Sequence, residues 1–136
     1  MNKAIIYLCL FAFIYSIDMD AAVNTLIKNA HKTSTHYCAA YVAKALKAGG
    51  FQFKAQGSAY MYRTKGVLVG MGYVEIPKPK EFKKGDITVT DRNKAHPHGH
   101  IAMWSGKKWI SDFVQNSEKV YRNDQPPVYY YTYKGN

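Results

Sequence analysis

The segment STHYCAAYVAKALKAGG, residues 34–50, carries the clearest helix signal in this chain of 136 residues. From Tyr37 to Ala48, apolar side chains recur at helical spacing, the lysines fall on the opposite side, and Gly49-Gly50 supplies a stop. The apolar stripe consists of Cys38, Tyr41, Val42, Ala45 and Leu46. Thr33, Ser34 and Thr35 are available as N-caps. The pattern predicts a helix with Cys38 in its first turn.

Further helices are predicted before and after this segment, and strands follow them. Asp20 to Ala30 repeats apolar residues at helical spacing, and SAYMYRTKGVLVGMG predicts a short helical stretch broken at Gly66 and Gly70. The predicted strands are YVEI, DITVT, HIAMW, WISDF and VYYYTY. Because helices precede antiparallel strands in a chain of one-domain length, we expect an α+β fold with N-terminal helices packed on a central sheet.

The first residues, MNKAIIYLCLFAFIYSI, form an apolar run shorter than the ~20 residues of a membrane span. We expect a secretory signal peptide over residues 1–20 and a catalytic domain over residues 21–136. The small residues that could precede the cut are Ser16, Ala21 and Ala22. Two alternatives stay open: Asp20 caps a helix beginning near Ala21, or the apolar run is a buried N-terminal helix.

The sequence contains two cysteines, and the first, Cys9, lies within the expected leader. Its removal leaves Cys38 without an intramolecular disulfide partner, so a secreted thiol needs a chemical explanation. At the start of a helix, unpaired backbone N–H groups and the positive end of the dipole favour a thiolate, which is the nucleophilic form. The competing interpretation is an ordinary buried cysteine on an apolar stripe.

The chain has 19 Lys and Arg against 9 Asp and Glu, a formal net charge of +10. Such a charge favours anionic partners, and an anionic bacterial envelope is one of them. The twelve tyrosines suggest base stacking, but no nucleic-acid-binding motif accompanies them and VYYYTY is typical of a strand. We therefore expect no nucleic-acid partner.

A base for Cys38 is predicted from the hairpin around Gly106. If HIAMW and WISDF pair across a three-residue loop, facing residue numbers sum to 212, and His100 lies opposite Asp112. Their Cβ atoms would then be ~5 Å apart, so the carboxylate could hold one imidazole nitrogen and leave the other for a thiol. A turn of two or four residues would place the two side chains on opposite faces.

Three motifs in this order resemble papain-like peptidoglycan hydrolases of the CHAP and NlpC types: YCAAYVAKALKAGGF, KKGDITVT and GHIAMW. The longer HPHGHIAMWSGKKWISDF, with GSAYMY and GMGYVEI, is similar to type VI secretion amidase effectors and to the secreted versions that arthropods acquired from bacteria. The resemblance spans roughly Ser34 to Gln115. The leader departs from the bacterial effectors, which favours a secreted eukaryotic descendant with a role in innate defence. An exported bacterial hydrolase is the open alternative.

The resemblance implies a papain-like fold in which Cys38 is the nucleophile, His100 the general base and Asp112 the residue that orients the base. Asp86, in the Gly-Asp motif, is expected to shape the strand entry. The implied function is that of a secreted antibacterial cysteine amidase acting on bacterial peptidoglycan, with the diaminopimelate–D-alanine crosslink as target. A monomer without organic cofactor is expected.

A metal site and two other functions compete with this prediction. His96, His98 and His100 alternate, which suggests a metal site, but Pro97 and Gly99 disfavour a regular strand there, so we expect no metal. A non-catalytic cationic protein that binds the bacterial envelope is the alternative function. A papain-like protease of ordinary proteins ranks last.

Overall fold

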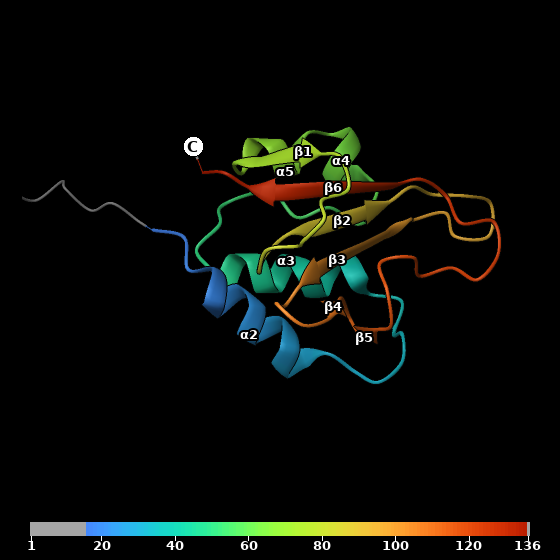
Figure 1. Cartoon of the computed structure of the whole chain (residues 1–136), viewed down its shortest axis with the longest axis horizontal. Coiled ribbons are helices and arrows are strands. Elements are labelled where there is room, and N and C mark those ends of the chain that lie inside the picture. Colours follow the sequence, from blue (N-terminus) through green and yellow to red (C-terminus); the bar gives the residue numbers. More distant parts are fainter. Residues whose placement is uncertain (1–15, 136) are drawn as a thin grey trace, which may run out of the picture.

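A computed structural model of the chain describes residues 16–135 (Figure 1). Within this range four helices come first: α2 (Met19–Asn29), α3 (Cys38–Ala48), α4 (Met61–Thr64) and α5 (Val67–Gly70). Six strands follow: β1 (Tyr73–Ile76), β2 (Ile87–Thr90), β3 (His100–Trp104), β4 (Trp109–Ile110), β5 (Val114–Gln115) and β6 (Val128–Tyr133). The α+β class is confirmed. Most of the expected leader, with Cys9, lies outside the described residues.

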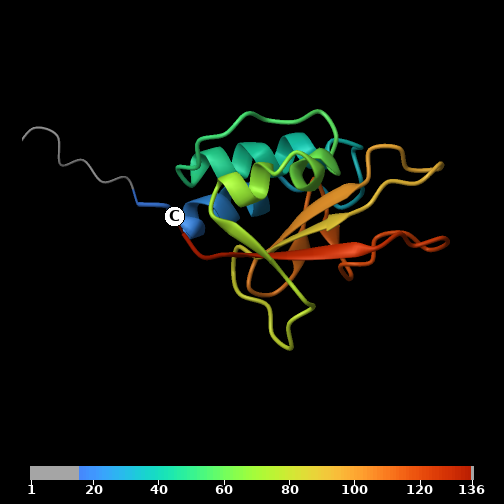
Figure 2. The same ribbon diagram turned by 90° about the horizontal axis from the view of Figure 1, so that it is seen from above.

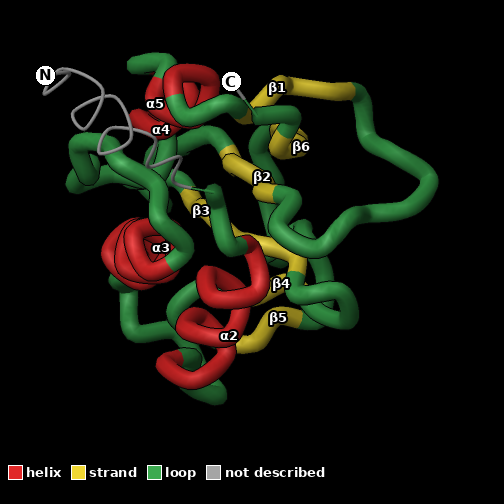
Figure 3. Tube along the Cα trace, turned by 90° about the vertical axis from the view of Figure 1, so that its left-hand side faces the viewer, coloured by secondary structure: helices red, strands yellow, loops and turns green. Residues whose placement is uncertain are grey.

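The strands form one antiparallel sheet in the order β1-β6-β2-β3-β4-β5. The helices lie against one face of it, while the loop between β1 and β2 extends on the other side (Figure 2). α2 and α3 pack on each other, and α3 also contacts β3 (Figure 3). The sheet therefore places the start of β3 near α3, which begins with Cys38.

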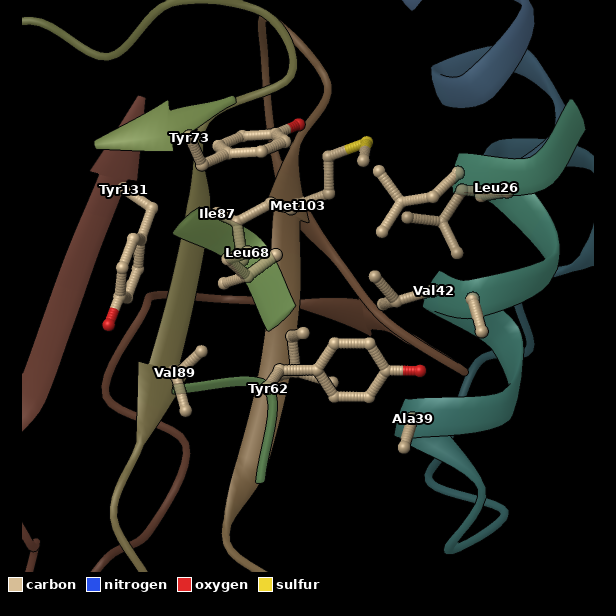
Figure 4. Packing of buried hydrophobic residues seen from close by; sticks show 14 of the residues in the cluster. Leu26, Ala39, Val42, Tyr62, Leu68, Tyr73, Ile87, Val89, Met103 and Tyr131 are labelled. Carbon is tan, nitrogen blue, oxygen red and sulfur yellow. The ribbon is translucent and has the colours of Figure 1, made fainter. Parts of the chain in front are cut away.

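The core fills the space between the helices and the sheet (Figure 4). Leu26 and Val42 point from α2 and α3 toward Ile87, Val89 and Met103 on the central strands. All five are at most 2 % exposed, and burial of each such side chain contributes roughly 1.5–3 kcal/mol. This packing fixes α3 on the sheet. None of the helices within residues 16–135 is long and apolar enough to cross a membrane.

The start of α2 differs from the sequence-based expectation. Asp18 is its N-cap, and its Oδ1 accepts a hydrogen bond from the Ala21 N–H at 2.9 Å. Asp20 lies in the first turn, so the idea that Asp20 caps a helix starting near Ala21 is wrong. An aspartate before the first turn satisfies a free N–H and complements the helix dipole, which explains why Asp18 takes this position. The expected domain boundary after residue 20 falls inside α2.

The hairpin register also differs. Met103 pairs with Ile110 and Trp104 with Trp109, so facing numbers sum to 213 and the turn has four residues rather than three. Ser105 explains the longer turn, because its Oγ accepts from the N–H groups of both Lys107 and Lys108. Strand β4 also ends at residue 110. The predicted pairing of residues 100 and 112 across the two strands is therefore wrong.

Candidate active site

A pocket of about 450 Å³ lies where the N-terminus of α3 meets the start of β3. Its lining includes Cys38, His100 and Asp112, which come from three separate segments of the chain. The other lining residues are Ser34, His36, Ala95, His96, Pro97, His98, Gly99, Phe113, Val120 and Tyr121. The structure thus brings all three predicted site residues into one cavity, although the register that predicted it is not the observed one.

Cys38 is the first residue of α3 and is partly buried. Burial raises the pKa of its thiol to about 11, and the negative charge of Asp112 adds to the rise. Hydrogen bonds from the backbone of Ile101, of Ala39 and of Cys38 itself act in the opposite direction. The backbone N–H groups at the helix start thus lower the pKa of Cys38 as expected, but loss of hydration outweighs their effect. With its pKa raised in this way, the Cys38 thiol would need a base in order to act as a nucleophile.

The side chain of His100 has a well-defined hydrogen-bond partner. His100 is 7 % exposed, and its Nε2 lies 2.6 Å from Oε1 of Gln115, which is equally buried on β5. Nε2 of Gln115 donates to the carbonyl of Ser117 at 3.0 Å, which orients the amide. Oε1 is therefore the acceptor, His100 carries its proton on Nε2, and Nδ1 is the basic nitrogen.

Burial lowers the pKa of His100, whereas the hydrogen bond to Gln115 and the charge of Asp112 act to raise it and the nearby His96 to lower it. The net shift is downward, so the imidazole is neutral at physiological pH. His100 and Cys38 line the same pocket, and a neutral imidazole is a proton acceptor. The pocket therefore contains a thiol and a neutral imidazole, the two groups that a cysteine nucleophile and its general base require.

Asp112 is fully buried, and its carboxylate is bound to the segment that leads into α3. Oδ2 accepts from the backbone N–H of Thr35 at 2.5 Å, from its hydroxyl at 2.9 Å and from the Ser34 hydroxyl at 3.4 Å. Oδ1 accepts from the Ser111 hydroxyl at 3.1 Å. Burial acts to raise the pKa of Asp112, but the hydrogen bonds from Thr35, from its own backbone and from Ser111 together outweigh it, so the pKa lies below its usual range. Asp112 was predicted to hold the imidazole of His100, but Gln115 makes that contact instead.

This arrangement also explains the beginning of α3. Tyr37 is its N-cap and makes no side-chain capping bond, so the expected caps at residues 33 to 35 are wrong. The hydroxyls of Ser34 and Thr35 bind Asp112 instead of the helix. A buried carboxylate must be hydrogen-bonded, and these donors supply that requirement. Asp112 therefore fixes the backbone just ahead of the nucleophile.

Gln115 is the functional residue that sequence reasoning missed. It belongs to no motif, and glutamine in a strand carries no chemical signal by itself. Its place follows from the pairing of β5 with β4, in which Gln115 lies opposite Trp109. The only available signal was that Gln115 follows Asp112 closely in the sequence. The predicted strand WISDF ends at Phe113, so residue pairing across it could not include Gln115.

His96 and His98 also line the pocket. His98 Nδ1 lies 2.6 Å from the Ser58 hydroxyl, and the His96 ring stacks on Tyr121 with centroids 3.8 Å apart. Gly99 has φ +67°, and a Cβ there would approach the Thr90 carbonyl to 2.5 Å, so the chain enters β3 only at His100. Among residues 16–135 no group of three or more His, Cys, Asp or Glu is arranged to hold a metal ion.

Asp86 lies apart from the pocket lining, at the entry to β2, and is 4 % exposed. Its Oδ1 accepts from the Thr132 hydroxyl at 2.7 Å, and its Oδ2 from the Lys83 N–H at 2.7 Å. These bonds tie the loop before β2 to β6. The contacts agree with the structural role expected from the sequence.

No family model matches the sequence, and no curated protein does. Two solved structures match: the native and the selenomethionine forms of the type VI effector–immunity complex Tae3–Tai3 from Ralstonia pickettii. The native form is 32% identical over 85% of this chain and 98% of that chain, with a TM-score of 0.73. The selenomethionine form is 34% identical over 82% and 99%, also with a TM-score of 0.73. The chain belongs to the Tae3 family of type VI effectors.

The match runs along nearly the whole Tae3 chain, so the kinship concerns the complete domain rather than one motif. The resemblance to type VI amidase effectors is thereby confirmed. The Tae3 structures support the α+β class, whereas the papain-like details expected from CHAP and NlpC hydrolases stay a prediction. In both solved structures the effector is bound to an immunity protein.

Proposed function

We propose that the protein is a secreted antibacterial cysteine amidase that hydrolyses peptide bonds of bacterial peptidoglycan. Membership of the Tae3 family supports the amidase class and the peptidoglycan substrate. The observation that supports the cysteine chemistry is that Cys38 and His100 both line the pocket where α3 and β3 begin. By resemblance to the amidase effectors, the bond cleaved is the diaminopimelate–D-alanine crosslink.

The reaction begins from the neutral pair. Nδ1 of His100 takes the thiol proton as the Cys38 sulfur attacks the amide carbon and forms a C–S bond. Backbone N–H groups at the start of α3, including that of Ala39, stabilise the oxyanion that develops. His100 then gives the proton to the leaving amine as the C–N bond breaks. Water deprotonated by His100 attacks the thioester, and the acid product leaves as the C–S bond breaks and the thiol is restored.

Gln115 and Asp112 support His100 in different ways. Gln115 holds the ring through Nε2 and keeps Nδ1 basic, which is the role the sequence had assigned to Asp112. Asp112 stays in the proposal as a charge, because its carboxylate raises the pKa of His100 and so favours the imidazolium formed during attack. It also holds the segment before Cys38 through Thr35.

The test is digestion of purified sacculi, followed by chromatographic and mass-spectrometric separation of the muropeptides. We expect the wild-type protein to remove crosslinked dimers, and Cys38→Ala and His100→Ala to leave them intact. Cys38→Ser is the matched control, since it keeps the shape of the site. If the wild-type protein leaves every dimer and tetramer intact, the amidase proposal is wrong. Killing that survives Cys38→Ala and falls with salt would identify the cationic envelope-binding alternative.

A further inference from the structure

A second hollow, of about 490 Å³, lies between the C-terminal end of α2 and the first two turns of α3. It is lined by Lys28, Asn29, His31, Ala40, Tyr41 and Lys44. None of these residues lines the pocket that contains Cys38. The hollow is therefore separate from the active site, although both use α3 as a wall.

The chemistry of this hollow is one-sided. Every lining side chain except Ala40 carries a hydrogen-bond donor, and two of them are lysines. No carboxylate lines it, and Lys28 and Lys44 take part in none of the ion pairs found within residues 16–135. His31 Nε2 lies 2.9 Å from the Tyr41 hydroxyl, and this contact orients the two rings relative to each other. Such a lining fits an anion.

The type of basic side chain in the hollow indicates which class of anion it fits. A carboxylate is best recognised by the planar fork of an arginine, whereas lysines act as separate point charges that suit the tetrahedral oxygens of phosphate. The hollow contains lysines and no arginine. We propose that it binds a phosphate group, either free phosphate or a phosphodiester of an envelope polymer. This inference goes beyond the amidase proposal and does not depend on it.

The two lysines contribute unequally. Lys28 lies in the last turn of α2, where the helix carbonyls carry partial negative charge that its ammonium offsets. Lys44 lies within α3, away from both helix ends, so its full charge faces the hollow. Loss of Lys44 is therefore expected to weaken phosphate binding more than loss of Lys28.

The hollow also adjoins the segment that forms the active site. The His31 N–H donates to the carbonyl of Asp112 at 2.8 Å, and the Val114 N–H donates to the carbonyl of His31 at 3.1 Å. Through these two hydrogen bonds the backbone of His31 is paired with the stretch that carries Asp112 and leads to Gln115. A cell-wall polymer bound through its phosphate in this hollow would keep the catalytic pocket close to the cell wall.

The first experiment uses isotopically labelled Cys38→Ala protein, so that hydrolysis cannot contribute. Inorganic phosphate is titrated at constant ionic strength against chloride, and backbone amide shifts are followed by NMR. We expect saturable shifts at His31, Ala40 and Lys44. The double variant Lys28→Gln/Lys44→Gln is expected to bind at least tenfold more weakly. The control Lys54→Gln/Lys65→Gln removes the same charge from exposed positions outside the hollow and is expected to bind like the parent.

The second arm separates the two sources of phosphate. Co-sedimentation compares cell walls that carry a phosphodiester polymer with the same walls stripped of it by hydrofluoric acid. Retention that falls on stripping and in the Lys28/Lys44 variant supports the polymer as source, and NMR binding without such retention supports free phosphate. Unsaturable shifts spread over all lysines, or equal weakening of both double variants, would overturn the proposal.

Discussion

The sharpest prediction concerns the reactivity of Cys38 in the free enzyme. Its pKa of about 11, against an ordinary value of 9.0, lowers the thiolate fraction at neutral pH about 100-fold. We therefore expect iodoacetamide to alkylate the folded mature protein about 100-fold more slowly than the same chain in denaturant. Mass spectrometry follows the reaction, and without the leader Cys38 is the only thiol. The rate should rise with pH toward a midpoint near the thiol pKa.

Asp112→Asn provides the matched perturbation. Removing the negative charge lowers the pKa of Cys38, so alkylation becomes faster than in the wild-type protein. The same change removes a charge that favours protonated His100, so cleavage of sacculi becomes slower. Thiol reactivity and turnover thus move in opposite directions. Wild-type alkylation that already reaches its plateau at neutral pH would indicate a thiolate–imidazolium pair and refute this reasoning.

Four further outcomes are expected. Thr132→Val leaves a buried oxygen of Asp86 without its donor and lowers the free energy of unfolding by about 1–3 kcal/mol in urea titrations, whereas an unchanged midpoint would contradict it. Because burial lowers the pKa of His100, the unfolded chain binds more protons than the folded one below pH 6.5. The free energy of unfolding therefore falls as the pH drops through that value, and His100→Gln makes this dependence on pH weaker. Gln115→Leu lowers turnover and changes the nitrogen NMR shifts of His100 from those of the Nε2–H tautomer, while wall binding is retained. N-terminal sequencing of the secreted protein finds cleavage after Ser16, since a later cut at residue 21 or 22 removes the cap and first turn of α2.

The helices and strands were largely predictable because their signals are local. The periodic stripe of Tyr37 to Ala48 and the glycines after it gave α3 almost to the residue. HIAMW and VYYYTY became β3 and β6 as expected. Local spacing decides these elements, since each buries one stripe or one face.

The site was predictable only as a set of residues. Cys38 and His100 were found from their positions at the start of a helix and of a strand, and both line the pocket. Asp112 was found through a register that one extra turn residue invalidates. Asp112 lies in the pocket because β4 ends at Ile110 and the chain then reverses into β5. Counting facing residues across two strands could not predict that reversal.

The sequence by itself determined the α+β class and the helix that begins at Cys38, because these depend on neighbours within a few residues. The catalytic roles of Cys38 and His100 stay predictions. The tertiary structure alone decided that Gln115 holds His100, that Asp112 binds Thr35, and that the Cys38 thiol is neutral at physiological pH. Those three properties depend on turn length and on burial by distant segments. Hydration and long-range hydrogen bonding are set only when the chain has closed around the pocket.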